Sequence, residues 1–100
     1  MIIVHVDTKI VPDSEALYVE AMTTLSKASK EEPGNVAYHF SKNLEEECRY
    51  LVTEVWESEA AFERHEDSVH YKAYLKEAQV GKFAVRPPRV IKFEGDIFTG

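Results

Sequence analysis

Apolar and polar positions alternate at the start of the chain. In residues 2–11, Ile2, Val4 and Val6 fall on one side of an extended chain, and β-branched side chains dominate the segment. This period of two predicts a β-strand. Pro12, which lacks a backbone N–H, is expected to end it.

The next segment has a helical period. Asp13 or Ser14 can cap a helix, and Glu15 would lie in its first turn, where negative charge is favourable. Pro33-Gly34 is expected to end this helix and to turn the chain. The apolar side chains between these limits recur on one helical face, at Leu17, Ala21, Met22, Leu25 and Ala28.

The remaining segments alternate between the two periods. An acidic NLEEE stretch between two of them indicates an antiparallel hairpin. Ser58 and Ser68 each stand where they can cap a following helix. The pattern predicts strands at 35–44 and 48–56, helices at 59–67 and 69–80, and a last strand at 89–94.

The resulting order is the split β-α-β-β-α-β pattern of a ferredoxin-like α+β fold. It predicts one four-stranded antiparallel sheet with helices on a single face, and residues 1–100 contain no linker that would divide them into two domains. Several strands carry apolar side chains on both faces, such as Leu51 and Val55 on one and Tyr50 and Val52 on the other. Because the helices can cover only one face, we expect a homodimer through the other, with strand ends or the IFTG tail crossing to the partner.

Composition and charge narrow the classes of partner. The formal net charge of −6 argues against a nucleic-acid partner, since a phosphate backbone needs a basic surface. Cys48 is the only cysteine, which excludes an intrachain disulfide, and we expect it to be half-buried. No stretch approaches the roughly 20 apolar residues of a membrane span, and the first residues lack the basic start of a signal peptide. A cytoplasmic protein with no membrane partner is therefore expected.

The stretch FERHEDSVHYKAY contains two histidines that invite comparison with a metal site. A zinc site on one helix uses histidines four residues apart. His65 and His70 are five apart, and on one continuous helix they would point about 140° away from each other. Only a helix break at Asp67-Ser68 would bring them together. No spacing of the neighbouring carboxylates selects a metal, so no metal is expected.

Acid–base chemistry has simpler requirements than metal binding. One imidazole near neutrality, held by a carboxylate or a phenol, is enough to move a proton. His70 follows a predicted helix cap, with Tyr71 and Glu54 as plausible neighbours. Glu54 lies between two apolar residues of one strand face, so it is expected to be buried and to need a polar partner. The alternative is a histidine that merely ends a helix or packs on the surface.

Cofactor motifs are missing from the chain. It contains no glycine-rich phosphate loop, no CxxC pair and no flavin or nicotinamide fingerprint. With four glycines in total, a phosphate-binding loop could hardly be built. If this protein is an enzyme, it is expected to work without a bound nucleotide cofactor.

Three stretches together resemble one protein family. EEPGNVAY, EVWES and FERHEDSVHYKAY are similar to the antibiotic biosynthesis monooxygenase (ABM) domain family, over essentially the whole chain. The resemblance implies a dimeric α+β barrel of two ferredoxin-like subunits. Family members include cofactor-independent oxygenases of quinols and polycyclic phenols, an isomerase of a phosphorylated autoinducer, and haem-degrading enzymes. The first two branches carry the histidine pair that corresponds to His65 and His70, whereas Asp7 and Leu75 depart from the haem-degrading site.

The leading hypothesis is a cofactor-independent monooxygenase of a quinol, phenol or polycyclic aromatic small molecule. Such an enzyme deprotonates its substrate, and the electron-rich anion then reduces oxygen. Either histidine would be the base, a glutamate would orient it, and a tyrosine would donate a hydrogen bond. The candidate residues are, for catalysis, His70, His65, Glu54 and Tyr71, and, for substrate binding, Tyr38, Trp56, Phe62 and Asn35.

Two other functions remain open. An acid–base isomerase of a phosphorylated hydroxycarbonyl compound needs a cationic cluster, with Lys72, Lys82, Arg86 or Arg89 turned toward the pocket. A non-catalytic dimeric binding module predicts ligand binding without proton or oxygen uptake. A sealed pocket, or histidines that point into solvent, would favour the binding module.

Overall fold

The structure, a computed structural model, describes residues 1–97 and contains every predicted strand and helix. The tail residues 98–100, which belong to the segment expected to cross to a partner, lie outside the described residues. In chain order, the elements are β1 (Ile2–Lys9), a 3₁₀ turn (Pro12–Ser14), α1 (Glu15–Lys30), β2 (Asn35–Lys42), β3 (Arg49–Trp56), α2 (Glu59–Glu66), α3 (Val69–Val80) and β4 (Arg89–Glu94).

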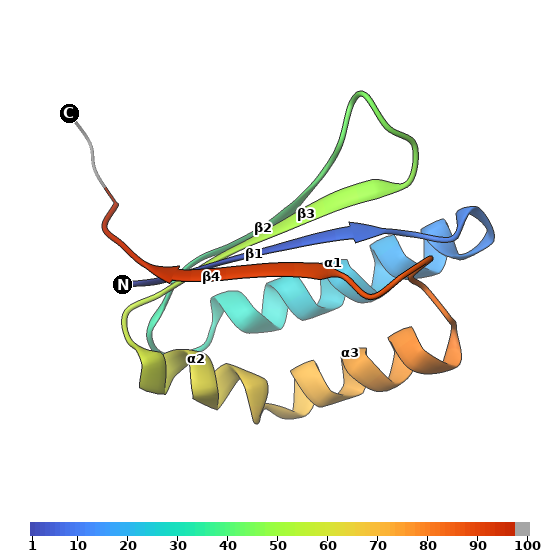
Figure 1. Cartoon of the computed structure of the whole chain (residues 1–100). Coiled ribbons are helices and arrows are strands. Elements are labelled where there is room, and N and C mark those ends of the chain that lie inside the picture. Colours follow the sequence, from blue (N-terminus) through green and yellow to red (C-terminus); the bar gives the residue numbers. More distant parts are fainter. Residues whose placement is uncertain (98–100) are drawn as a thin grey trace.

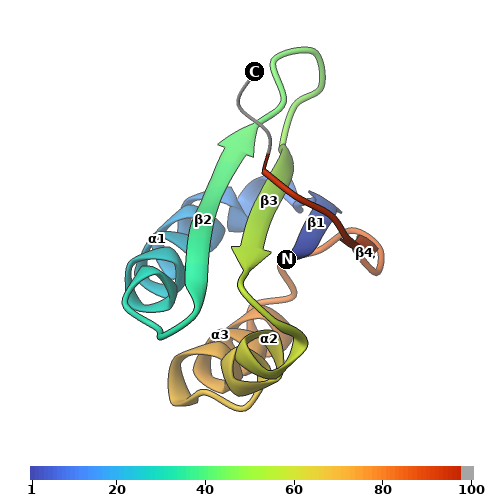
Figure 2. The ribbon, with the colours of Figure 1, turned by 90° about the vertical axis from the view of Figure 1, so that its left-hand side faces the viewer.

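The four strands form one antiparallel sheet in the order β2-β3-β1-β4. Its central strands place Ile2 opposite Trp56 and Val6 opposite Val52. All three α-helices lie on the same side of this sheet (Figure 1). In Figure 2, α1 lies to the left of β2, and α2 and α3 lie together below the strands. The predicted ferredoxin-like α+β fold is therefore confirmed.

Helices α2 and α3 begin at the serines predicted to cap them. Ser58 Oγ accepts a hydrogen bond from the Ala61 backbone N–H at 3.1 Å, and Ser68 Oγ accepts one from the Tyr71 N–H at 3.2 Å. These contacts satisfy N–H groups that have no partner within the helix. Two separate caps in succession explain why the chain breaks at Asp67 instead of continuing as one helix.

The start of α1 differs from the prediction. Neither candidate cap makes a side-chain hydrogen bond to the helix, because Ser14 already has helical backbone angles and its hydroxyl donates to the Gly81 carbonyl at 3.2 Å. Tyr18 takes the inward position predicted for Leu17, which is 57% exposed. The prediction that Leu17 lies in the core is wrong.

Two smaller corrections concern the sheet. Strand β1 ends at Lys9, and Ile10 beyond it makes only an isolated bridge to Ala84. Cys48 is buried, not half-buried, in the turn before β3 with a left-handed φ of 58°. No helix within residues 1–97 has both the length and the apolar character that crossing a membrane requires.

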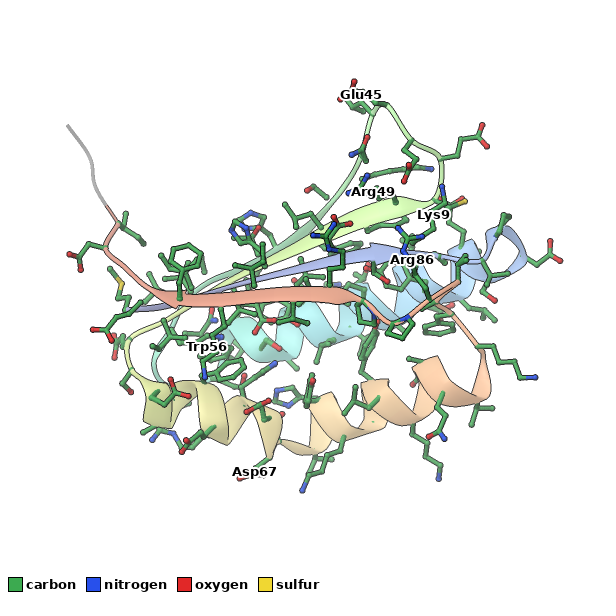
Figure 3. All side chains as sticks on the ribbon, viewed as in Figure 1. Lys9, Glu45, Arg49, Trp56, Asp67 and Arg86 are labelled. Carbon is green, nitrogen blue, oxygen red and sulfur yellow. The ribbon has the colours of Figure 1, made fainter. Side chains whose placement is uncertain are left out.

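The two faces of the sheet have different environments. Trp56 lies on the helical side, whereas Arg49 lies on the open side (Figure 3), where it donates two hydrogen bonds to Asp7. The core lies on the helical side and includes Val4, Tyr18, Met22, Leu25, Tyr38, Val52 and Trp56. By strand register, the open face carries Ile3, Leu51, Val55, Ile91 and Phe93. Ile91 and Phe93 remain 58% and 44% exposed, so apolar side chains lie uncovered on this face of the described chain, beside polar ones such as His5 and Thr53.

Candidate functional site

The break between α2 and α3 brings the two histidines together. His65 lies in the last turn of α2 and His70 in the first turn of α3, and their ring centroids are 6.1 Å apart. Ser68 holds this junction, because its hydroxyl caps α3 and also donates to the His65 carbonyl at 2.6 Å. The register argument for one continuous helix therefore does not apply, since the chain turns between the two imidazoles.

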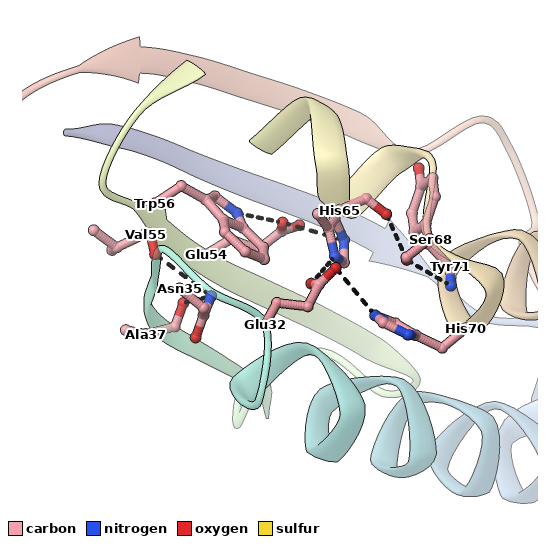
Figure 4. Close-up of polar contacts among 10 residues, drawn as sticks. All are labelled: Glu32, Asn35, Ala37, Glu54, Val55, Trp56, His65, Ser68, His70 and Tyr71. Carbon is pink, nitrogen blue, oxygen red and sulfur yellow. Dashed lines mark hydrogen bonds and ion pairs between the residues drawn. The ribbon is translucent and has the colours of Figure 1, made fainter. Parts of the chain in front are cut away.

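Glu32 lies between the two histidines (Figure 4). Its Oε2 is 2.7 Å from His65 Nδ1, and its Oε1 is 3.3 Å from His70 Nε2. Sequence reasoning missed this residue, which follows α1 in the EEPG turn. The only signal was a glutamate immediately before a helix-ending Pro-Gly pair. The chain turns just after Glu32 at Gly34, which has a φ of 86°. An added Cβ at Gly34 would lie 2.6 Å from the Ala61 Cβ, so this turn packs closely on α2.

Glu54 faces the other side of the His65 ring. Its Oε1 accepts a hydrogen bond from Trp56 Nε1 at 3.1 Å and is 3.7 Å from His65 Nε2. Burial raises the pKa of Glu54 to about 7, the Trp56 hydrogen bond opposes this rise, and the charges of Glu66 and Glu32 add to it. A carboxyl with this pKa can take or return a proton at neutral pH.

His65 is almost fully buried, with 1% of its surface exposed. Burial lowers the pKa of its imidazole, and the hydrogen bond to Glu32 opposes this effect. The neutral ring donates its Nδ1–H to the Glu32 carboxylate, which leaves the lone pair of Nε2 directed toward Glu54. Nε2 has no hydrogen-bond partner among the described residues. Trp56 covers the ring with a centroid separation of 4.8 Å.

A cavity of about 330 Å³ lies between the sheet and all three α-helices. It exists because α3 packs more closely on α1 than on the strands. Aliphatic and aromatic side chains form most of its lining, and Glu54, His65 and Glu66 supply polar groups. The aromatic lining includes Tyr18, Tyr38, Phe62, Tyr71, Tyr74 and Phe83.

The cavity separates the predicted site residues into two groups. His65, Glu54, Tyr71, Tyr38 and Phe62 line it. Three others do not: Trp56 lies behind His65, His70 lies beyond Glu32, and Asn35 donates to backbone carbonyl groups of β2 and β3. Asn35 therefore supports the start of β2 in this structure.

A wider groove lies between α1 and α3, with a volume of about 600 Å³. Leu17, Ala21 and Val80 contribute its apolar lining, and its charged side chains are exposed. It contains no histidine and no buried carboxylate. The smaller cavity is the candidate site, because acid–base groups meet an enclosed apolar space there.

Metal binding can be tested against the same geometry. Glu32, His65 and His70 each offer one ligand atom, and the three atoms lie within 4.8 Å of one another. Two atoms that share a tetrahedral zinc ion at 2.0–2.2 Å stand about 3.3–3.6 Å apart. The 2.7 Å between His65 Nδ1 and Glu32 Oε2 is the length of a charge-assisted hydrogen bond instead. The expectation that no metal binds stays a prediction.

Known proteins resemble this chain in sequence. The family model described as "Antibiotic biosynthesis monooxygenase" matches residues 1–77. Among curated proteins, "Putative monooxygenase YcnE" of Bacillus subtilis (strain 168) is 25% identical over 75 residues, which span 75% of this chain and 79% of that protein.

Solved structures share the fold. One is described as a "putative antibiotic biosynthesis monooxygenase" from Deinococcus radiodurans and has a TM-score of 0.90 at 17% identity. The match covers 100% of this chain and 97% of the Deinococcus chain. Another with the same description, from Caulobacter crescentus CB15, has a TM-score of 0.86 at 25% identity. That match covers 96% of this chain and 90% of the Caulobacter chain.

Proposed function

Because the chain belongs to the antibiotic biosynthesis monooxygenase family, we propose that it is a monooxygenase that deprotonates a small phenol or quinol and needs no cofactor. The observation that carries this proposal is a buried carboxyl with a pKa of about 7 on the wall of an aromatic cavity. Glu54 is the base in this proposal. His65 accepts the proton from it through the free lone pair of Nε2.

The size and lining of the cavity limit the substrate. Its 330 Å³ lies at the low end of the volumes of small-molecule pockets. This volume favours a compact aromatic substrate of one or two rings over a large polycyclic one. Tyr38 and Tyr71 can donate hydrogen bonds to a substrate oxygen, since burial raises the pKa of both phenols and keeps them protonated. Phe62 forms an apolar wall.

The proposed reaction balances without any further reagent. Glu54 takes the hydroxyl proton of a hydroquinone, and the anion transfers electrons to O₂ and forms a carbon–oxygen bond to it. The proton returns as the O–O bond breaks. One oxygen atom remains on the ring, the other leaves as water with two hydrogens of the substrate, and the ring is oxidised to a hydroxyquinone. The apolar walls exclude bulk water from the reactive anion.

The charges around the cavity favour this reaction over isomerisation of a phosphorylated compound. Neither lysine nor arginine occurs among the described residues that line the cavity, whereas Glu54 and Glu66 do. Lys72, Arg86 and Arg89 are exposed. An anionic phosphate in this space would therefore meet negative charge without a compensating cation.

We also propose that two copies pair through their open sheet faces. The apolar side chains on that face support this, since burying each contributes roughly 1.5–3 kcal/mol. Their sum can exceed association costs of order 4–15 kcal/mol. The pairing covers the exposed apolar side chains of this face, such as Ile91 and Phe93, and leaves the cavity on the helical side.

Oxygen uptake tests the catalytic proposal. Metal-stripped wild-type protein is incubated under air with a panel of benzohydroquinones and naphthohydroquinones in an oxygen electrode. At least one should be oxidised, and Glu54→Gln should lower kcat by about 10²–10⁴-fold, the range for loss of a general base. Glu63→Gln, an exposed change on α2, is the matched control and should retain full activity.

Three results would count against this proposal. Full activity of Glu54→Gln would remove the assigned base. Activity that appears only after a divalent metal is added back would indicate a metal enzyme. Binding of hydroquinones without any oxygen uptake would instead support the non-catalytic binding module.

A further inference from the structure

Four acid–base side chains form a row that leads from the cavity to the surface. Glu54 borders the cavity, His65 follows it, Glu32 follows His65, and His70 ends the row with 28% of its side chain exposed (Figure 4). Carboxylate and imidazole alternate along it. We propose that this row is a proton relay between the cavity and solvent, in which Glu32 and His70 act without touching the substrate. The inference rests on the proposed function, because it assumes that Glu54 receives a substrate proton.

The inner half of the row has the tautomer that a relay requires. His65 Nδ1 donates to Glu32 Oε2 at 2.7 Å, so Nε2 on the opposite side of the ring is free to accept a proton. Glu54 Oε1 lies 3.7 Å from Nε2, just beyond hydrogen-bond length. A small approach of Glu54 once it is protonated closes this gap. The imidazole can then gain a proton at Nε2 and release the other from Nδ1 to Glu32.

The outer half continues in the same way. Glu32 uses one oxygen toward His65 and the other toward His70 Nε2, 3.3 Å away. That nitrogen is buried and has no hydrogen bond among the described residues. His70 can therefore accept a proton from Glu32 at Nε2, while another part of the same ring is exposed to solvent. Each turnover of the proposed oxygenation moves one proton out along the row and one back.

Other titratable groups near Glu54 offer alternative routes for the proton, in competition with the proposed row. Glu66 on α2 borders the cavity and is exposed, so it is the principal rival exit. Tyr38 on β2 and Tyr71 on α3 also face the cavity, but burial raises the pKa of both phenols, which makes them poor proton carriers at neutral pH. A test must therefore separate His70 from Glu66.

The test uses a chromogenic phenol, so that proton transfer is measured without turnover. 4-Nitrophenol is bound to wild-type protein, the pH is raised in a stopped-flow mixer, and phenolate absorbance reports ionisation of the bound phenol. His70→Gln and Glu32→Gln should each slow ionisation at least about tenfold, a modest loss for a proton-transfer group. The fraction of bound phenol ionised at equilibrium should not change in His70→Gln. Added imidazole should restore its rate.

Further variants distinguish the proposed relay from an exit through Glu66. Lys76→Gln, an exposed change on α3, should ionise the phenol at the wild-type rate. Glu66→Gln tests the rival exit and should slow ionisation less than His70→Gln does. An unchanged rate in both His70→Gln and Glu32→Gln would overturn the relay while leaving the proposed function intact. Slowing in Glu66→Gln alone would assign the route to Glu66 and also overturn it. Failure of wild-type protein to bind any phenol would overturn the proposed function, and the relay with it.

Discussion

Tyr18 is fully buried, yet its hydroxyl has no hydrogen-bond partner among the described residues. A buried unsatisfied hydroxyl is destabilising by about 1–3 kcal/mol. We expect Tyr18→Phe to raise the free energy of unfolding by about 1 kcal/mol in urea denaturation. Tyr50→Phe is the matched control and should lower it by a similar amount, because the Tyr50 hydroxyl donates to Glu15 at 2.8 Å. A loss of stability in Tyr18→Phe would indicate that water in the cavity satisfies the hydroxyl.

Glu54 should make stability depend on pH in a defined direction. Its pKa is about 7 in the folded chain and 4.5 in the unfolded chain. Below pH 4.5 the carboxyl is protonated in both states, and above it the unfolded chain releases the proton first. The stability of wild type relative to Glu54→Gln should therefore fall by up to about 3 kcal/mol as pH rises from 4.5 through 7. Urea unfolding at pH 4.5 and pH 8 measures this, and parallel profiles for the two proteins would contradict it.

At the scale of residues, the sequence predicted part of the site. Glu54 could be identified because a carboxylate between apolar neighbours on one strand face must be buried. His65 was a candidate because it forms a pair with His70 on either side of the predicted helix break, and because the family resemblance includes this pair. Glu32 could not, because its role depends on where a turn places a flexible side chain relative to a distant helix. The separation of His70 from the cavity has the same cause.

At the scale of elements, the junction between α2 and α3 should affect oxygen uptake as well as the free energy of unfolding. Ser58→Ala and Ser68→Ala each remove a helix cap and should each lower the free energy of unfolding by about 1 kcal/mol. Only Ser68→Ala also removes the hydrogen bond to the His65 carbonyl. Oxygen uptake should therefore fall in Ser68→Ala and not in Ser58→Ala. Equal activity in both variants would show that the junction keeps its geometry without this serine.

The order of the elements followed from periodicity, because each strand alternates, and the starts of α2 and α3 followed from their capping serines. Phase within a helix was harder to predict. In α1, periodicity alone cannot distinguish Leu17 from Tyr18 as the inward residue, because both are apolar. The cavity could not be predicted either, since it results from how far α3 stands from the sheet.

At the scale of the whole molecule, the open sheet face predicts the oligomeric state. Phe93→Asp places a charge on the surface where two copies would pair, and should give aggregated or unfolded chain, not a stable monomer. Sedimentation velocity and circular dichroism measure both outcomes. Leu17→Asp is the matched control, since Leu17 is also an exposed apolar residue but lies on α1, and it should sediment as wild type does. A wild-type monomer at micromolar concentration would contradict the pairing.

The turn between the two histidines also limits how the length of this chain can vary. A residue inserted or deleted between His65 and His70 would alter the junction that Ser68 holds and would move the second imidazole away from Glu32. An insertion near Leu44, at the exposed tip of the β2–β3 hairpin, would change nothing around the cavity. We therefore expect natural or engineered length changes to be tolerated at that tip, and a fixed spacing to be required between the two rings.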